Sequence, residues 1–273
     1  MTENGNTLVF HTSHQRYLTE DGKHHQSQLT IIVDTSTMKV TNNLGLFQSN
    51  YVSHSFDQYV QFDGSTHVLI DHGDAYQRSI VLQKSSDDYG YYSVDLFKIL
   101  GATGATGANA TGANATGVCV GGFEVSSENY IVAINSIDHS LEKKYDSYST
   151  DGLKEDQRDI IICIAPRQNT ENGEVKQITL AKYIGTKKIA SIPQLVKISD
   201  EKFMVLWQEF NLPDYTQGAV KYIYIDKTGK ASSQIETMEA NTLSTCQPIV
   251  VGNEVLWYCN GLGYRTFYTI PIE

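Results

Sequence analysis

The sequence lacks the features that mark membrane proteins and nucleic-acid binders. No apolar run approaches the roughly 18 residues that a membrane-spanning helix needs, so membrane insertion is not expected. Acidic residues outnumber basic ones, 31 to 21, and no basic stripe is present to follow nucleic-acid phosphates or an anionic lipid surface. The opening residues, MTENGNTLVF, have neither the basic nor the apolar part of a signal peptide. Nucleic acids and membranes are therefore excluded as expected partners.

Recognisable catalytic and metal-binding motifs are also missing. The chain has no C-x-x-C pair, no H-E-x-x-H, no G-x-S-x-G turn, no phosphate loop and no S-x-D-x-G-x-T-W box of the sialidase type. Thiolate zinc sites are therefore not expected from the four cysteines, and we predict no cofactor. Helical periodicity is nearly absent as well, which indicates an all-β chain.

A repeated pattern of strands and turns fills the sequence instead. SIPQLVKISDEKFMVLWQEF followed by VKYIYID, and STCQPIVVGNEVLWYCN followed by RTFYTIPI, both give strand, tight turn, strand, polar loop and strand. Repeats of this size are typical of β-propeller blades. Five such repeats can be aligned. We therefore predict a single all-β domain over residues 1–273, a β-propeller with five blades and incomplete first and last blades.

The repeats predict where the blade strands lie, when these are labelled A to D from the inside outwards. Strand A is predicted at Phe56–Phe62, Gly122–Val125, Gln194–Ile198 and Gln247–Val251. Strand B is predicted at Leu8–Phe10, Val68–Ile70, Ile131–Ile134, Met204–Trp207 and Val255–Trp257. Strand C is predicted at Leu29–Val33, Ser79–Leu82, Ile160–Ile164, Tyr222–Ile225 and Phe267–Ile270.

The two terminal repeats are each one strand short in this scheme, because the first has no strand A and the last has no strand D. Three explanations stay open. The chain is a segment of a longer array, or the register near Met1 differs, or a second copy supplies the missing edges and forms a homo-oligomer.

Residues 101–117, GATGATGANATGANATG, form a low-complexity insertion. Collagen needs glycine at every third position, and here the glycine spacing of 3, 3, 5 and 5 breaks after two triplets. We therefore predict a surface loop between blades rather than a triple helix.

The cysteine pair near the end of the chain has a specific spacing. If Gly252 and Asn253 form a two-residue hairpin turn, facing residue numbers sum to 505, which places Cys246 opposite Cys259. A cross-strand disulfide and a pair of packed thiols both fit this pairing.

The loops between strands B and C leave the same face of a propeller, and they vary in length while the strands do not. Variable loops on a regular scaffold are where binding sites are usually found. Histidines, carboxylates and arginines in and around these loops form the predicted ligand-binding set. The set is His11, His14, His25, His54, Asp71, His72, Asp74, Arg78, Asp138, His139, Arg158 and Glu209.

These side chains have three candidate roles. Histidine with carboxylates can bind a divalent metal or carry out acid–base chemistry, although no tight histidine spacing indicates a metal. The structural alternative has the histidines and arginines joining neighbouring blades through hydrogen bonds and ion pairs. Enzymatic propellers use two or three inward carboxylates for glycoside hydrolysis. Asp57, Asp71 and Glu209 are candidates for such a set, but their spacing does not select them.

Several segments of the sequence resemble those of a known group of proteins. They are HHQSQLTIIVDTSTMKV, YVSHSFDQYVQFDG, DHGDAYQRSIVL, VGGFEVSSENYIVAINSIDHS, DQRDIIICIA and PQLVKISDEKFMVLW. Together they resemble a group of uncharacterised bacterial β-propeller repeat proteins, many of them secreted or on the cell surface. The resemblance covers most of the chain and implies an extracellular or cell-surface location, but it implies no activity and no catalytic residue.

The leading expectation is a non-enzymatic module that recognises a glycan or a protein through the face of the B–C loops. The first alternative is a carbohydrate-active hydrolase or lyase that uses carboxylates and histidines of the same face. The second is a structural repeat segment of a larger surface protein, with no ligand of its own.

Overall fold

The computed structural model describes residues 2, 3, 6–18, 22, 24–41, 55–73, 79–85, 91–98, 117–138, 157–238, 242–260 and 263–272. These residues form β-strands joined by turns and a short 3₁₀ helix at Thr170–Asn172. Nowhere in these ranges is there a helix with the length and hydrophobicity that crossing a bilayer requires. Apart from Gly117, the predicted insertion at 101–117 lies outside them.

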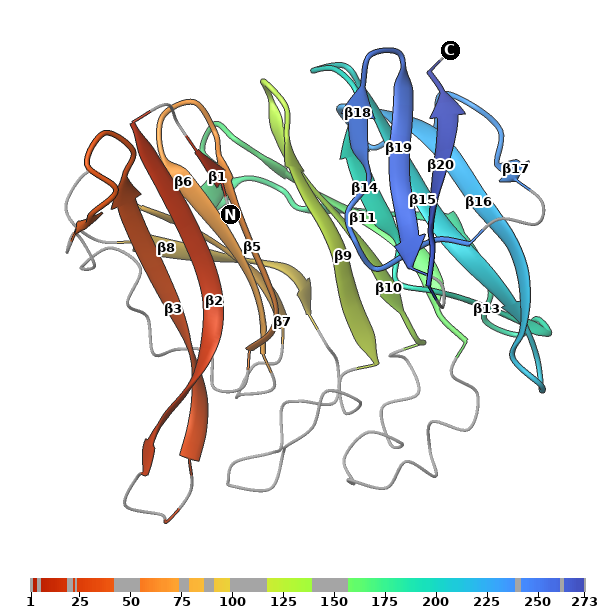
Figure 1. Ribbon diagram of the computed structural model, residues 1–273, viewed down its shortest axis with the longest axis horizontal. Coiled ribbons are helices and arrows are strands. Elements are labelled where there is room, and N and C mark those ends of the chain that lie inside the picture. Colours follow the sequence, from red (N-terminus) through yellow and green to blue (C-terminus); the bar gives the residue numbers. More distant parts are fainter. Residues whose placement is uncertain are drawn as a thin grey trace. The chain divides into compact units, whose positions relative to one another are not determined.

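The strands form five antiparallel sheets, each built from a continuous stretch of the chain (Figure 1). Two compact units hold these sheets. Unit 1 contains β1 to β8 with the 3₁₀ helix, and unit 2 contains β9 to β20. The chain is therefore all-β with the five-bladed organisation of a β-propeller, as the repeats predict. That residues 1–273 form one domain stays a prediction.

Unit 1 holds two four-stranded sheets. The first contains β1 (Thr2–Glu3), β2 (Thr7–Leu18), β3 (His24–Asp34) and β4 (Val40–Thr41). The second contains β5 (Ser55–Phe62), β6 (His67–Gly73), β7 (Ser79–Ser85) and β8 (Tyr91–Lys98). Val9, Val60 and Leu69 pack between the two sheets, where β2 meets β5.

The prediction of an incomplete first blade is wrong. Strand β1 pairs with β2, with Thr2 opposite Val9 and Glu3 opposite Leu8, so it occupies the position of strand A. The sequence pattern missed it because this polar two-residue strand has none of the apolar alternation that signals a strand.

Unit 2 holds three sheets. The first contains β9 (Val118–Val125), β10 (Asn129–Ser136), β11 (Asp159–Pro166) and β12 (Lys176–Ala181). The second contains β13 (Lys188–Ala190), β14 (Gln194–Lys197), β15 (Lys202–Asn211), β16 (Thr216–Asp226) and β17 (Glu236–Met238). The third contains β18 (Ile249–Val251), β19 (Glu254–Asn260) and β20 (Arg265–Pro271). Within the described ranges this last sheet has three strands, which fits a last blade without strand D.

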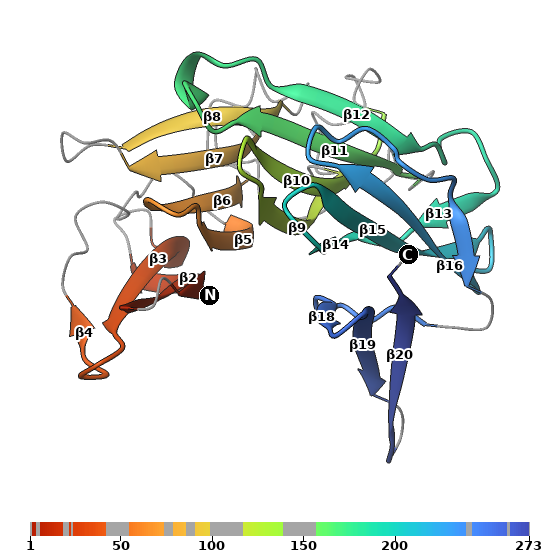
Figure 2. The same ribbon diagram turned by 90° about the horizontal axis from the view of Figure 1, so that it is seen from above.

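All predicted A, B and C segments lie within or overlap the observed strands. In unit 2 the inner strand β9 lies directly beside β14 (Figure 2). Glycines make this close approach feasible, because a Cβ added at Gly121 would lie 1.6 Å from the carbonyl oxygen of Pro193. Large side chains such as Phe203 and Trp207 fill the core between these two sheets.

The register of β18 and β19 confirms the predicted turn, with Val250 opposite Val255 and Val251 opposite Glu254. Strand β18 begins only at Ile249, so the paired region ends before it reaches Cys246. Cys246 and Cys259 are both free thiols. Of the two arrangements compatible with the sequence, the structure contains thiols and not a disulfide.

Thiol labelling is expected to separate the cysteines by burial. Cys246 is exposed, whereas Cys163 is fully buried, and burial raises the pKa of its thiol to about 12. Because the thiolate is the reactive form, titration with Ellman's reagent should modify Cys246 in the native protein and Cys163 only after unfolding in denaturant. Rapid modification of Cys163 in the native protein would contradict the burial of β11.

Candidate functional site

A buried histidine joins the two sheets of unit 1. His11 Nε2 lies 3.0 Å from Asp71 Oδ1, and His11 Nδ1 lies 3.0 Å from Thr30 Oγ1. A hydroxyl, an imidazole and a carboxylate in this order also occur at nucleophilic active sites. Here, however, the side chains of His11 and Asp71 have no exposed surface, and Thr30 is buried too. The arrangement therefore suits the structural alternative, in which a histidine locks the interface between blades.

A second pair links neighbouring strands of the second sheet. His72 Nδ1 lies 2.9 Å from Asp57 Oδ2, and the two residues are cross-strand partners on β6 and β5. Because side chains alternate along a strand, Asp71 and His72 point to opposite faces of the sheet. The Asp57 side chain is 22% exposed while that of His72 is 1% exposed, so this pair presents one carboxylate to solvent.

The structure places several of the predicted residues in strands, although they were expected in or near loops. His14 and His25 lie in β2 and β3, and Glu209 lies in β15. The strands extend past the apolar runs that predicted them, because backbone pairing continues through polar residues. Four predicted residues lie outside the described ranges: His54, Asp74, Arg78 and His139.

The two remaining predicted residues lie in unit 2. Asp138 follows the end of β10 and is half-buried. Arg158 precedes β11, and its Nη1 donates a hydrogen bond to Cys119 Sγ at 3.1 Å, which joins β11 to β9. Among all the residues that the structure describes, no three potential metal ligands come together as a group.

The A–B turns of two sheets in unit 2 lie at the same end of that unit. The backbone N–H of Ser127 donates to Asp200 Oδ2 at 3.0 Å. Lys227 Nζ binds Glu128 at 2.7 Å and Glu201 at 2.8 Å. Strand B of each sheet runs away from its A–B turn, so the far ends of β10 and β15 also share one end of unit 2.

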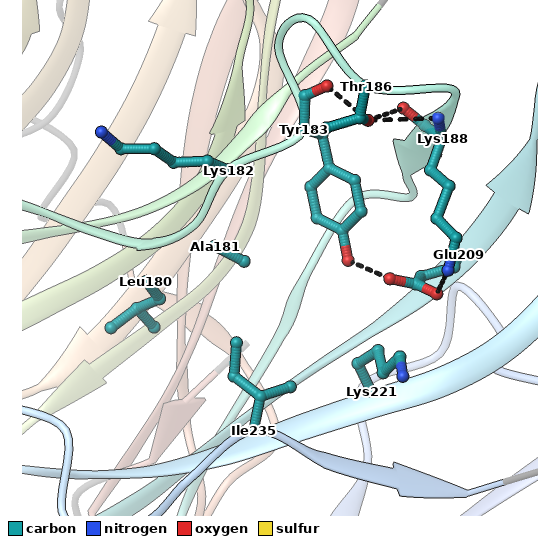
Figure 3. A pocket seen from close by; sticks show the side chains of 9 residues that line it. All are labelled: Leu180, Ala181, Lys182, Tyr183, Thr186, Lys188, Glu209, Lys221 and Ile235. Carbon is teal, nitrogen blue, oxygen red and sulfur yellow. Dashed lines mark hydrogen bonds and ion pairs between the residues drawn. The ribbon is translucent and has the colours of Figure 1, made fainter.

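At that far end a cavity of about 500 Å³ opens between the two sheets (Figure 3). Its walls come from the end of β12, the loop after it, strands β13, β15 and β16, and the residue before β17. The lining residues are Leu180, Ala181, Lys182, Tyr183, Thr186, Lys188, Glu209, Lys221 and Ile235.

A carboxylate with both oxygens held lies at the wall of this cavity. The Tyr183 hydroxyl donates to Glu209 Oε1 at 2.7 Å, and Lys188 Nζ donates to Glu209 Oε2 at 2.7 Å (Figure 3). The Trp207 indole N–H donates to the Tyr183 hydroxyl oxygen at 2.6 Å. Burial, together with the hydrogen bond to Glu209, raises the pKa of Tyr183 well above its ordinary value. The phenol therefore keeps its proton and acts as a donor to Glu209.

The loop that carries Tyr183 is fixed by side chains at the start of β11. Asp159 Oδ1 accepts the backbone N–H groups of Tyr183 at 2.6 Å and Ile184 at 3.0 Å. Gln157 Oε1 accepts the N–H of Gly185 at 2.7 Å, and its amide donates to the carbonyl of Thr186. Hydrogen bonds of this kind from neighbouring side chains fix the loop backbone and therefore the position of the Tyr183 side chain.

Sequence reasoning missed this loop because it considered only the B–C loops. In a blade with alternating strand directions, the loop from strand D to the next strand A leaves at the same end as the B–C loop. Applying this rule to the segment from the end of β12 to the start of β13 would have identified Tyr183 and Lys188 as candidates.

Glu124 is a further acidic residue with an unusual environment. It lies on the innermost strand β9 and accepts a hydrogen bond from Gln247 Nε2 at 3.1 Å. Burial raises its pKa to about 7 despite the opposing effect of Lys197. Because Glu124 is next to the A–B turn, it lies at the end of unit 2 away from the cavity.

Comparison with known proteins gives several similar solved structures, among them two enzymes that act on arabinose-containing sugars. The sequence matches no protein-family model and no curated protein. An α-L-arabinanase from Penicillium chrysogenum, complexed with arabinobiose, is 10% identical with a TM-score of 0.49, covering 98% of this chain and 81% of its own. An α-L-arabinofuranosidase from Fusarium graminearum, complexed with an iminosugar inhibitor, is 12% identical with a TM-score of 0.45, covering 93% and 77%. At these values neither structure assigns an activity, so a functional proposal depends on the residues of this chain.

Proposed function

We propose that the protein is a carbohydrate-active hydrolase and that the cavity of unit 2 binds the sugar. The observation that carries the proposal is Glu209, a buried carboxylate at the cavity wall whose two oxygens are held by Tyr183 and Lys188. Cavities of this size with apolar walls and a few convergent polar groups are typical of small-ligand sites. The proposal replaces the leading expectation from the sequence, a non-enzymatic recognition module, with its first alternative, a carbohydrate-active hydrolase.

The proposed mechanism uses two acidic side chains, as glycoside hydrolysis generally does. One acts at the anomeric carbon, directly or through water, and the other protonates the leaving oxygen. Glu209 accepts hydrogen bonds at both oxygens, which suits the nucleophile or base. The described residues that line the cavity hold no second carboxylate, so the acid has to come from outside this lining. Asp138 follows β10 at the same end of unit 2 and is half-buried, and we name it as the candidate acid. We also propose that the protein meets its glycan partner outside the cell or at the cell surface.

The second candidate function is recognition of a glycan without cleavage. One observation favours it: among the described residues that line the cavity, Glu209 is the only carboxylate. A binding site needs no second acid, whereas hydrolysis by the two-carboxylate route does.

A direct assay separates the two functions. The purified full chain is incubated with neutral and acidic polysaccharides, including arabinan, and the release of reducing ends is measured beside binding by calorimetry. We expect new reducing ends from one class of polysaccharide. Binding without any product would contradict hydrolysis and support recognition, and the absence of both would contradict both functions.

A further inference from the structure

The cavity of unit 2 carries charge of the opposite sign to the whole chain. The chain has a formal net charge of −10, whereas the cavity is lined by three lysines, Lys182, Lys188 and Lys221, and one glutamate, Glu209. A recess lined by one sign of charge raises the local concentration of ligands of the other sign. The lining therefore favours an anionic ligand over a neutral one.

Two of these lysines lie where a ligand would contact them. Lys188 and Lys221 flank Glu209, whereas the ammonium of Lys182 points away from it (Figure 3). Lys188 Nζ contacts Glu209 Oε2 at 2.7 Å, and Lys221 Nζ donates to Thr237 Oγ1 at 2.6 Å. An ammonium group has three N–H donors, so both lysines keep donors for a bound anion.

The other walls suit a sugar ring. Leu180, Ala181 and Ile235 provide an apolar surface on the side of the cavity away from Lys188 (Figure 3). A pyranose ring has an apolar C–H face that can pack on such a surface, while its polar substituents point to the opposite wall. An anionic substituent on the ring would then meet Lys188 and Lys221.

We propose that this cavity binds a sugar that carries a carboxylate, such as a hexuronic acid unit of an acidic polysaccharide. The apolar wall takes the ring, and Lys188 and Lys221 take its carboxylate. The inference rests on the proposed function, whose substrate class it names.

Calorimetry with matched ligands tests the inference. The full chain is titrated with oligosaccharides of galacturonic acid, with galactose oligosaccharides of equal length, and with inorganic phosphate. A hydrogen bond to a charged group contributes more to affinity than one between neutral groups, and a tenfold change in affinity corresponds to about 1.4 kcal/mol. Solvent screening at this open cavity reduces the gain, so we expect the acidic oligosaccharide to bind about tenfold more tightly than the neutral one.

Two variants show whether the lysine is responsible. Lys221→Gln should reduce the preference for the acidic oligosaccharide from about tenfold to about twofold or less. Lys230→Gln makes the same chemical change at an exposed position on the turn that Asp226 caps, and it should leave the preference unchanged. Raising the salt concentration should weaken binding of the acidic oligosaccharide more than that of the neutral one.

The outcomes separate this inference from the proposed function. Equal affinity for acidic and neutral oligosaccharides, or phosphate binding as tight as the uronate, would overturn the inference. If the wild type cleaves a neutral polysaccharide and Lys221→Gln cleaves it at the same rate, the inference of an acidic substrate is overturned while the hydrolase proposal stands. Preferential binding of the uronate without cleavage of any polysaccharide would support the inference and reject the hydrolase.

Discussion

Replacing Asp71 with alanine is expected to lower the free energy of unfolding by about 3–5 kcal/mol. The change leaves His11 without its carboxylate partner inside the interface between β2 and β6, where neither side chain has exposed surface. It also removes the acceptor that a buried polar ring needs there. Urea unfolding followed by fluorescence measures the effect as a shift of the midpoint to lower denaturant.

Asp57→Ala is the matched control, because it removes a carboxylate from the second histidine pair, where the aspartate is 22% exposed. We expect less than half the loss for this variant, since water can replace the missing group. In a double-mutant cycle, His11→Ala and Asp71→Ala should be non-additive by about 0.5–3 kcal/mol. Wild-type stability of Asp71→Ala together with a loss of ligand binding would show that Asp71 belongs to a binding site.

The strands could be predicted because the signals that define them are local. At Asp63, in the turn before β6, the carboxylate accepts the backbone N–H groups of Ser65 and Thr66, both at 2.9 Å. Asp226 makes a similar bond at 2.8 Å to the N–H of Thr228 in the turn after β16. Such turns need only a few neighbouring residues, and apolar runs on either side complete the hairpin.

The polar side-chain pairs, both the structural pair of unit 1 and the one at the cavity of unit 2, were less predictable because their members come from distant parts of the chain. His11 meets Asp71 at a separation of 60 residues, and Tyr183 meets Glu209 at a separation of 26. No local pattern encodes which face of which sheet a polar residue will meet. Sequence reasoning therefore identified His11, Asp71 and Glu209 as polar residues near strand ends, but it could not separate buried interface pairs from a carboxylate at a cavity wall.

The strongest functional effect is expected from Glu209→Gln. Under the hydrolase proposal this change should lower kcat/KM by about 10²–10⁴-fold, the usual contribution of an acid–base side chain. Glutamine keeps the size of the side chain and an oxygen that Tyr183 can reach at its present distance of 2.7 Å, but it lacks the charge that pairs with Lys188. The measurement is the initial rate of reducing-end release, with substrate affinity determined separately by calorimetry.

Glu201→Gln provides the control of identical chemistry. Glu201 lies in the A–B turn at the other end of unit 2, where it pairs with Lys227 and is 65% exposed, so its replacement should leave the rate within about twofold. Asp138→Asn should slow hydrolysis as Glu209→Gln does, because the leaving oxygen then loses its proton donor. If Glu209→Gln hydrolyses the substrate as fast as the wild type, the reaction does not depend on this carboxylate, and the cavity is a binding site at which no bond is cleaved.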